Sequence, residues 1–141
     1  MNEEVKIMIL MKANEVDTNE LTSFFENNEA IDKEAVKKEG YIVTNNNHII
    51  GCFILKRIEQ NNFWLKQLFI TKAEANTLPT LLQLILQLAK AKAAHEVYVH
   101  SHQLMVDLLL QSLQFHPQER SELLKSLPRQ KGIWWSYKIS S

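Results

Sequence analysis

Two histidines, His100 and His102, are the side chains of this sequence best suited to acid–base chemistry at neutral pH. They flank Ser101 at the end of an apolar stretch, EVYVH, which predicts a β-strand over residues 96–100. If the strand continues that far, both imidazoles lie on one face, where either can act as a general base or the pair can bind a metal. The competing interpretation is two solvent-exposed histidines in a turn. Since no third ligand occurs at a recognisable spacing, we predict no metal site.

The single cysteine, Cys52, alternates with Ile50 and Ile54 in an apolar run. This pattern favours a packed small hydrophobic side chain over a reactive thiol, because no basic neighbour or helix N-terminus in the sequence would lower its pKa. One cysteine cannot form an internal disulfide, and the apolar run near the N-terminus is too short and interrupted for a signal peptide. We therefore expect a reducing, cytoplasmic setting.

The first half of the chain contains sequence patterns typical of strands and helices. These elements help to position the histidine and cysteine side chains described above. Asparagines dominate the sequence TNNN at residues 44–47, and asparagine tolerates positive φ, so a hairpin turn is expected there. The predicted elements are a strand at 4–11, a helix capped by Asp17 or Thr18, a helix at 28–38 ending at Gly40, the hairpin of residues 41–55, and a strand at 63–70.

The clearest predicted element is a helix at residues 78–93, whose apolar side chains form one wide face. Thr77 is its expected N-cap, and Pro79 is tolerated in its first turn. The elements expected after it are the strand at 96–100, a helix at 103–112, a short strand at 113–115, a charged insertion at 117–131 with one or two helical turns around 122–127, and a strand at 133–139.

Trp134 and Trp135 point to opposite faces of this last predicted strand. Either the pair is mostly buried, with one ring covered by the 117–131 insertion, or one ring is exposed and marks a partner surface such as a homodimer contact. The basic residues of the insertion are interrupted by Glu119 and Glu122, which favours a solvated face.

Chain length, hydrophobic content and net charge bear on the number of domains and on the kinds of binding partner to expect. A chain of 141 residues with 45% hydrophobic content is expected to form one domain over residues 1–141. Its 16 basic and 16 acidic residues cancel, so the chain has no positive field that would favour nucleic acid or an anionic membrane, and we expect neither as a partner. No stretch approaches the length of a membrane span.

The order of these elements resembles the GNAT (Gcn5-related N-acetyltransferase) family from about Glu4 to Ile139. The segments that resemble the family are GYIVTNNNHIIGCFIL for the hairpin, LKQLFI for the fourth strand, LLQLILQLAKAKAAHEVYV for the long helix and fifth strand, and LLLQSLQF for the short helix. The resemblance implies an α/β (α+β) fold: a mixed, mostly antiparallel sheet of six or seven strands, flanked by about four helices. It also implies acyl transfer to an amine, with acetyl-CoA or another acyl-CoA as cofactor.

In the family a Q/R-x-x-G-x-G/A loop between the fourth strand and the long helix holds the pyrophosphate of acetyl-CoA. The corresponding residues, TKAEANTL at 71–78, are fewer than usual and contain no glycine. A Cβ hinders close approach of phosphate, although asparagine can adopt left-handed geometry, a lysine adds a cation and the helix start offers free N–H groups. By resemblance, the residues expected to bind the cofactor are Lys72, Asn76, Thr77 and Leu78 in this loop, and Gln67, Leu68, Phe69 and Ile70 through backbone N–H donation to the acyl carbonyl.

The family's proton-moving positions differ here. Trp64 stands where many members have a glutamate base, and Leu110 stands where a tyrosine usually protonates the thiolate. Neither side chain can transfer a proton at neutral pH. Two hypotheses follow: an acyl-CoA-dependent N-acetyltransferase with a divergent loop, in which His100 replaces the base, or a GNAT-fold binding or regulatory module that has lost acetyl-CoA chemistry. The acceptor amine, a small molecule or a peptide, is not specified by the sequence.

Overall fold

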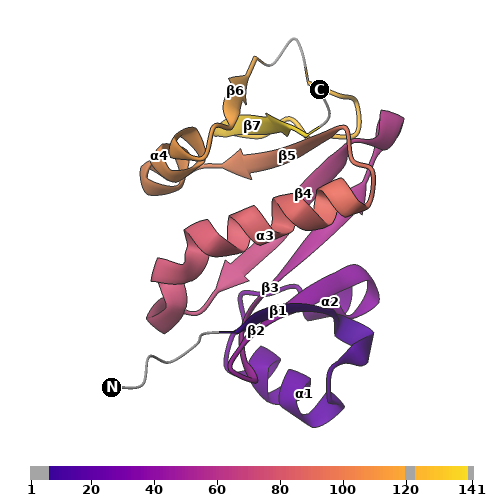
Figure 1. Cartoon of the computed structure of the whole chain (residues 1–141), viewed down its shortest axis with the longest axis vertical. Coiled ribbons are helices and arrows are strands. Elements are labelled where there is room, and N and C mark those ends of the chain that lie inside the picture. Colours follow the sequence, from indigo (N-terminus) through magenta and orange to yellow (C-terminus); the bar gives the residue numbers. More distant parts are fainter. Residues whose placement is uncertain (1–6, 120–122, 140–141) are drawn as a thin grey trace. The chain divides into compact units, whose positions relative to one another are not determined.

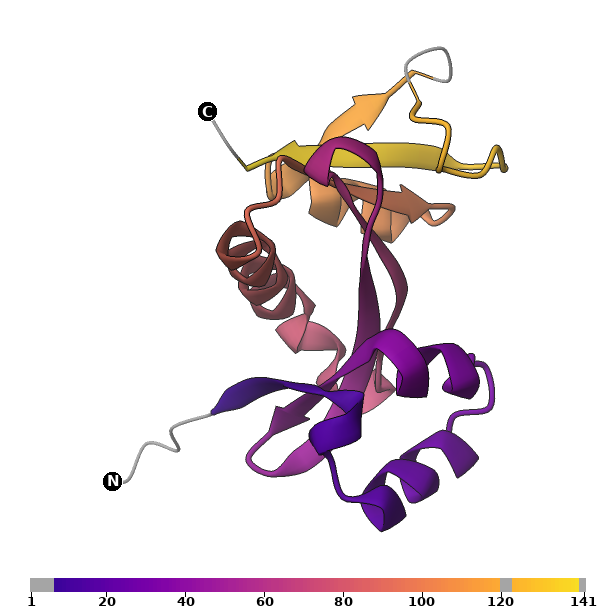
Figure 2. The same ribbon diagram turned by 90° about the vertical axis from the view of Figure 1, so that its right-hand side faces the viewer.

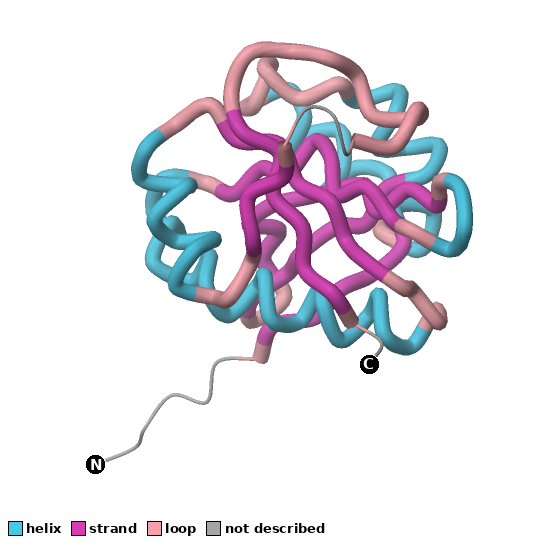
Figure 3. Tube along the Cα trace, turned by 90° about the horizontal axis from the view of Figure 1, so that it is seen from above, coloured by secondary structure: helices cyan, strands magenta, loops and turns pink. Residues whose placement is uncertain are grey.

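The computed structural model describes residues 7–119 and 123–139. These residues contain both strands and helices (Figure 1), and Figure 3 colours the same elements by type. The strands are β1 (Met8–Lys12), β2 (Gly40–Asn45), β3 (His48–Arg57), β4 (Phe63–Ile70), β5 (Glu96–Ser101), β6 (His116–Gln118) and β7 (Ile133–Lys138). The α-helices are α1 (Thr18–Glu26), α2 (Lys33–Glu39), α3 (Leu78–Ala91) and α4 (Leu104–Ser112), and short 3-10 helices are η1 (Ala13–Glu15), η2 (Glu59–Asn61) and η3 (Lys72–Thr77).

The strands form a seven-stranded sheet in the order β1-β2-β3-β4-β5-β7-β6. The pairs β1–β2, β2–β3, β5–β7 and β6–β7 are antiparallel, and β4–β5 is parallel. This confirms the predicted α+β fold with a mixed, mostly antiparallel sheet.

Two compact units make up the chain. The first runs to Ile54 and includes Gln67–Asn76, and the second contains Leu55–Lys66 and the chain from Thr77 onward. Strands β3 and β4 run through both units. The expectation of a single domain over residues 1–141 stays a prediction.

In the first unit, α1 and α2 pack on the hairpin β2–β3 (Figure 2). The Asp17 side chain caps α1 by accepting hydrogen bonds from the Asn19 and Glu20 N–H groups (2.9 and 3.2 Å), as predicted. The hairpin turn is also confirmed, since Asn46 and Asn47 have φ of 53° and 68°. The buried cluster that results is Ala13, Leu21, Phe24, Phe25, Ile31, Val36, Ile42, Cys52 and Ile54.

Two element boundaries in the first unit differ from the prediction. The second helix begins at Lys33 rather than residue 28, because the Asn28 side chain donates to the Phe24 carbonyl (2.7 Å) and closes the end of α1 instead. Asp32 then caps α2 through the Ala35 N–H (3.2 Å). The first strand is Met8–Lys12, while residues 4–6 of the predicted strand lie outside the described residues.

In the second unit, α3 buries Leu81, Leu82, Ile85 and Ala89, which confirms its predicted apolar face. The helix ends at Ala91 rather than residue 93, because Ala93 has φ of 60° and the Ala94 N–H donates back to the Ala89 carbonyl (3.0 Å). Among the described residues, none of the helices is long and apolar enough to cross a membrane.

Two predictions after α4 are wrong. Residues 113–115 are not a strand: Gln114 has φ of 72°, and the Phe115 N–H donates to the Leu110 carbonyl (3.0 Å), so this segment ends the helix and the strand starts at His116. The described part of the predicted helical turns, residues 123–127, contains no helix and instead has a turn closed by a hydrogen bond from the Leu127 N–H to the Leu124 carbonyl (3.1 Å). Glu122 lies outside the described residues.

Candidate functional site

Strand β4 contains an interruption at Gln67, where φ is 53°. A single left-handed residue inside a strand is typical of a β-bulge, which turns backbone groups away from the regular ladder. The parallel register of β4 with β5 covers only Phe63, Trp64 and Leu65, opposite Val97, Tyr98 and Val99. The segment Lys66–Ile70 therefore continues the strand beyond that register, and Gln67 itself is exposed.

Within the first unit, strand β3 lies against the Gln67–Ile70 segment of β4. A Cβ added to Gly51 would lie 2.3 Å from the Phe69 carbonyl oxygen, so only glycine permits the close approach of the two strands. The Thr71 N–H donates to the Ile50 carbonyl (2.8 Å), and Phe69 packs edge-on against Phe24 with ring centroids 6.1 Å apart. The four residues predicted to hold an acyl carbonyl, Gln67 to Ile70, are thus fixed on one side and continuous in the strand.

The segment between β4 and α3 is the 3-10 helix η3, which runs directly into α3 at Leu78. This corrects two expectations. Asn76 lies in η3 and is not among the residues with positive φ, so it does not adopt left-handed geometry. Thr77 occupies the expected N-cap position, but with helical dihedral angles (φ −87°, ψ −5°) and without a side-chain cap hydrogen bond. Whether Lys72, Asn76, Thr77 and Leu78 bind a cofactor stays a prediction.

His100 belongs to the second unit and is half-buried. Its Nε2 lies 2.6 Å from the Lys131 carbonyl oxygen, and because a carbonyl can only accept, Nε2 carries the proton. In the neutral ring the free lone pair is then on Nδ1. The ring also packs against Trp134 and His102, with centroids 5.2 and 6.1 Å away. The two histidines therefore lie side by side, but β5 ends at Ser101, and His102 is exposed in the segment after it.

Gly132 supports this arrangement and was not identified from the sequence. Its φ is 109°, and a Cβ there would lie 2.4 Å from the Ser101 carbonyl oxygen and 2.8 Å from the His100 Nε2. Glycine is thus required for the chain to pass this close to His100. The available signal was the glycine immediately before an alternating strand, GIWWSYKI.

The positions that carry proton transfer in the resembled family are apolar here and well packed. Trp64 is half-buried, meets Trp134 edge-on at 5.7 Å and has the Lys66 Nζ 4.5 Å from its ring centroid. Leu110 is 1% exposed. Cys52 is fully buried, and burial raises the pKa of its thiol to about 12, which confirms the packed interpretation.

Both tryptophans of β7 are buried. Trp134 packs with Leu123 and Leu127 and donates from Nε1 to the Pro128 carbonyl (3.1 Å), so the 117–131 insertion covers it. Trp135 donates from Nε1 to the Asp107 carboxylate (2.9 Å). The interpretation of an exposed tryptophan as a partner surface is therefore wrong, and a homodimer stays a prediction without this support.

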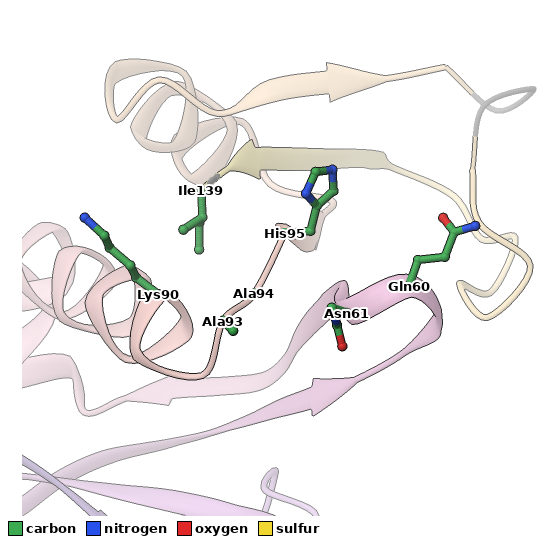
Figure 4. A pocket seen from close by; sticks show the side chains of 7 residues that line it. All are labelled: Gln60, Asn61, Lys90, Ala93, Ala94, His95 and Ile139. Carbon is green, nitrogen blue, oxygen red and sulfur yellow. The ribbon is translucent and has the colours of Figure 1, made fainter. Parts of the chain in front are cut away.

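A cavity of about 500 Å³ lies in the second unit, at the C-terminal end of α3 (Figure 4). Lys90, Ala93, Ala94 and His95 contribute from α3 and the segment after it, and Gln60, Asn61 and Ile139 line the rest. Since α3 has 14 residues, this cavity is about 20 Å along the helix from Leu78, where α3 begins. It contains none of the predicted site residues, so we do not assign the acyl-transfer site to it. Among the described residues, no group of three or more His, Cys, Asp or Glu side chains is arranged to hold a metal.

Neither a protein-family model nor a curated protein sequence matches the chain. Solved structures do. A GNAT-family acetyltransferase from Staphylococcus aureus superposes with a TM-score of 0.72 at 17% identity, over 95% of this chain and 100% of that one. An acetyltransferase from Streptococcus agalactiae gives 0.70 at 13% identity, over 93% of this chain and 98% of that one.

A third structure, N-acetylglutamate synthase from Neisseria gonorrhoeae complexed with coenzyme A and N-acetyl-glutamate, gives a TM-score of 0.72 at 13% identity. The likeness covers 99% of this chain but 36% of the synthase. At these identities the comparisons establish architecture, and they agree with the strand order and register described above. The chain has the fold of the GNAT superfamily.

Proposed function

We propose that this protein transfers an acyl group from a coenzyme A thioester to an amine. The observation that carries the proposal is the left-handed Gln67 in β4, placed just beyond the last residue paired with β5, Leu65. A strand that leaves its neighbour at such an interruption has main-chain N–H groups available for a ligand. Solved structures of this fold with coenzyme A bound support the choice of ligand class.

The acyl and pantetheine part of the donor fits this segment better than its diphosphate fits η3. A thioester carbonyl needs one or two N–H donors, and the backbone of Gln67–Ile70 can supply them without any particular side chain. Leu68 and Ile70 are half-buried apolar residues that suit the acyl and pantetheine carbon chain. When bound, the thioester would supply an acyl carbon activated for attack.

Acyl transfer would form a C–N bond to the amine and break the C–S bond of the thioester. In this proposal His100 accepts the proton that the amine loses, and that proton balances the charge of the thiolate that leaves. Because Nε2 donates to the Lys131 carbonyl, the neutral ring has its lone pair at Nδ1. The hydrogen bond at Nε2 fixes both the tautomer and the ring orientation, which is the usual way a histidine base is prepared. The donor-binding and base roles belong to separate residues and can be tested separately.

Donor binding is tested by the melting temperature in millimolar acetyl-CoA, since a ligand that binds only the folded state must stabilise it. Two variants at one position form a matched pair. Gln67→Gly keeps the left-handed backbone at little cost, whereas Gln67→Val disfavours it, because a β-branched residue is strained at positive φ. The ligand-induced shift should persist in the first variant and disappear in the second.

The base is tested by His100→Ala, which should abolish acyl transfer in an amine-acceptor screen while leaving the acetyl-CoA shift intact. Transfer that survives the substitution would show that another group removes the proton.

The second candidate is a binding or regulatory module without catalysis, with the cytoplasmic setting expected in either case. It is favoured by Trp64 and the buried Leu110, which cannot transfer protons. Absence of a melting-temperature shift with any coenzyme A thioester would select this candidate and reject the enzyme.

A further inference from the structure

Two backbone N–H groups of the connection between β4 and α3, those of Thr71 and Glu74, are already used in hydrogen bonds within the fold. Backbone N–H groups in a 3-10 helix bond to carbonyls three residues earlier, and the Glu74 N–H donates to the Thr71 carbonyl in this way (3.0 Å). Ahead of η3, the Thr71 N–H is taken by the Ile50 carbonyl (2.8 Å). A diphosphate placed here would have to compete with these internal hydrogen bonds.

The backbone conformation of this connection also differs from an anion-binding cradle. Concave nests of N–H groups alternate right-handed and left-handed residues. Among the described residues, positive φ occurs at Gln67 and Ala93, on either side of the connection, but not within 71–78. The segment also lacks glycine, so every residue presents a Cβ where phosphate oxygens would have to approach.

The charges of the connection cancel. Lys72 is exposed and Glu74 is half-buried, and these are the only charged residues from 71 to 78. An anionic group meets one attractive and one repulsive charge, so the segment offers no net electrostatic attraction. Three independent properties of the connection therefore disfavour the nucleotide half of coenzyme A, while the Gln67–Ile70 segment is unaffected.

We infer that the donor is recognised through its pantetheine thioester arm, and that the nucleotide half of coenzyme A contributes little to binding. The inference rests on the proposed function and specifies its substrate class: thioesters of pantetheine, whether free, on coenzyme A or on a carrier protein. A hydrogen bond to a charged group is usually worth tenfold or more in affinity, so its absence is measurable.

The test is calorimetric titration of the full chain with S-acetylpantetheine, acetyl-CoA and 3′-phosphoadenosine 5′-diphosphate, which is the nucleotide half of coenzyme A. The first two should have dissociation constants within about threefold of each other, because the shared arm provides the contacts. The nucleotide alone should give no heat of binding at millimolar concentration. Acetyl-CoA binding more than about tenfold tighter than S-acetylpantetheine overturns the inference but leaves the proposed function standing. If neither thioester binds, the proposed function falls, and the inference falls with it.

Lys72→Ala provides the matched variant, since this exposed side chain is the one cation in the connection and its removal should not affect folding. The ratio of the two dissociation constants should stay unchanged in the variant. A selective loss of acetyl-CoA affinity would show that Lys72 contacts the diphosphate and would refute the inference.

An acetylated carrier protein, used as a fourth ligand, distinguishes protein-bound from free donors. Binding at least as tight as that of S-acetylpantetheine indicates a carrier-bound source, and weaker binding indicates a free one.

Discussion

Replacing Gly132 by alanine should destabilise the folded chain by about 3 kcal/mol. An alanine at φ of 109° occupies a backbone region that costs roughly 1–3 kcal/mol. Its Cβ would also lie 2.4 Å from the Ser101 carbonyl oxygen, and relieving such an overlap costs roughly another 1–3 kcal/mol. Reduced freedom of the unfolded chain offsets about 0.4–1 kcal/mol. For a chain of this size the net loss lowers the melting temperature by roughly 10 °C.

Urea unfolding of the variant beside Lys131→Ala measures this effect. Only the main-chain carbonyl of Lys131 bonds to His100 and its side chain is exposed, so that control should stay within about 0.5 kcal/mol of the parent chain. Nitrogen NMR should in addition detect the Nε2-protonated tautomer of His100 in the parent and control proteins, and a change in the glycine variant. A stability loss for Gly132→Ala below about 1 kcal/mol would refute the reasoning about both the backbone and the close approach.

Three further results are expected. Burial raises the pKa of Cys52 to about 12, so the native protein should resist iodoacetamide at pH 8 and react only after unfolding; rapid native labelling would contradict this. Burial, and then the charge of Glu96, raises the pKa of Tyr98 from 10.0 to about 12, so its contribution to stability is fully present below pH 10 and is lost between about pH 10 and 12. Denaturant titrations should show a larger loss of stability over this range in the parent than in Tyr98→Phe, since Cys52 contributes its own loss in both proteins. Asp17→Ala removes the cap of α1 and should lower the unfolding free energy by about 1 kcal/mol, measured beside the exposed control Thr22→Ala.

Much of the fold follows from local patterns. The α3 face, the asparagine turn and the strand Phe63–Ile70 were predictable because their signals are periodic or conformational and act within a few residues. The ends of helices and strands that depend on a single side-chain contact were not predictable from the sequence. Asn28 ends α1 by bonding to Phe24, and the sequence gives no reason to prefer that contact over starting the next helix.

The candidate site was less predictable because its geometry depends on the backbone. Glutamine has no preference for left-handed conformation, so nothing in the sequence marks Gln67 as the interruption in β4. The pairing of His100 with the Lys131 carbonyl joins residues 31 apart in sequence, which no local pattern specifies. By contrast, the lack of glycine in residues 71–78 and of proton-transferring side chains at Trp64 and Leu110 could be read directly from the sequence, because these are properties of residue type.

The two ends of the sheet order differ in how they resist strand addition by other molecules. At β6, Pro117 lacks an N–H group, so an incoming strand cannot complete its ladder there. At β1, the Ile7 main chain bonds toward Asn46, so by alternation the N–H and C=O groups of Met8, Leu10 and Lys12 point away from β2, where the described residues place no other strand. Ile7 and Ile9 are also 55% and 43% exposed. Aggregation of this protein at high concentration should therefore begin at β1, and a proline at Leu10 would suppress it.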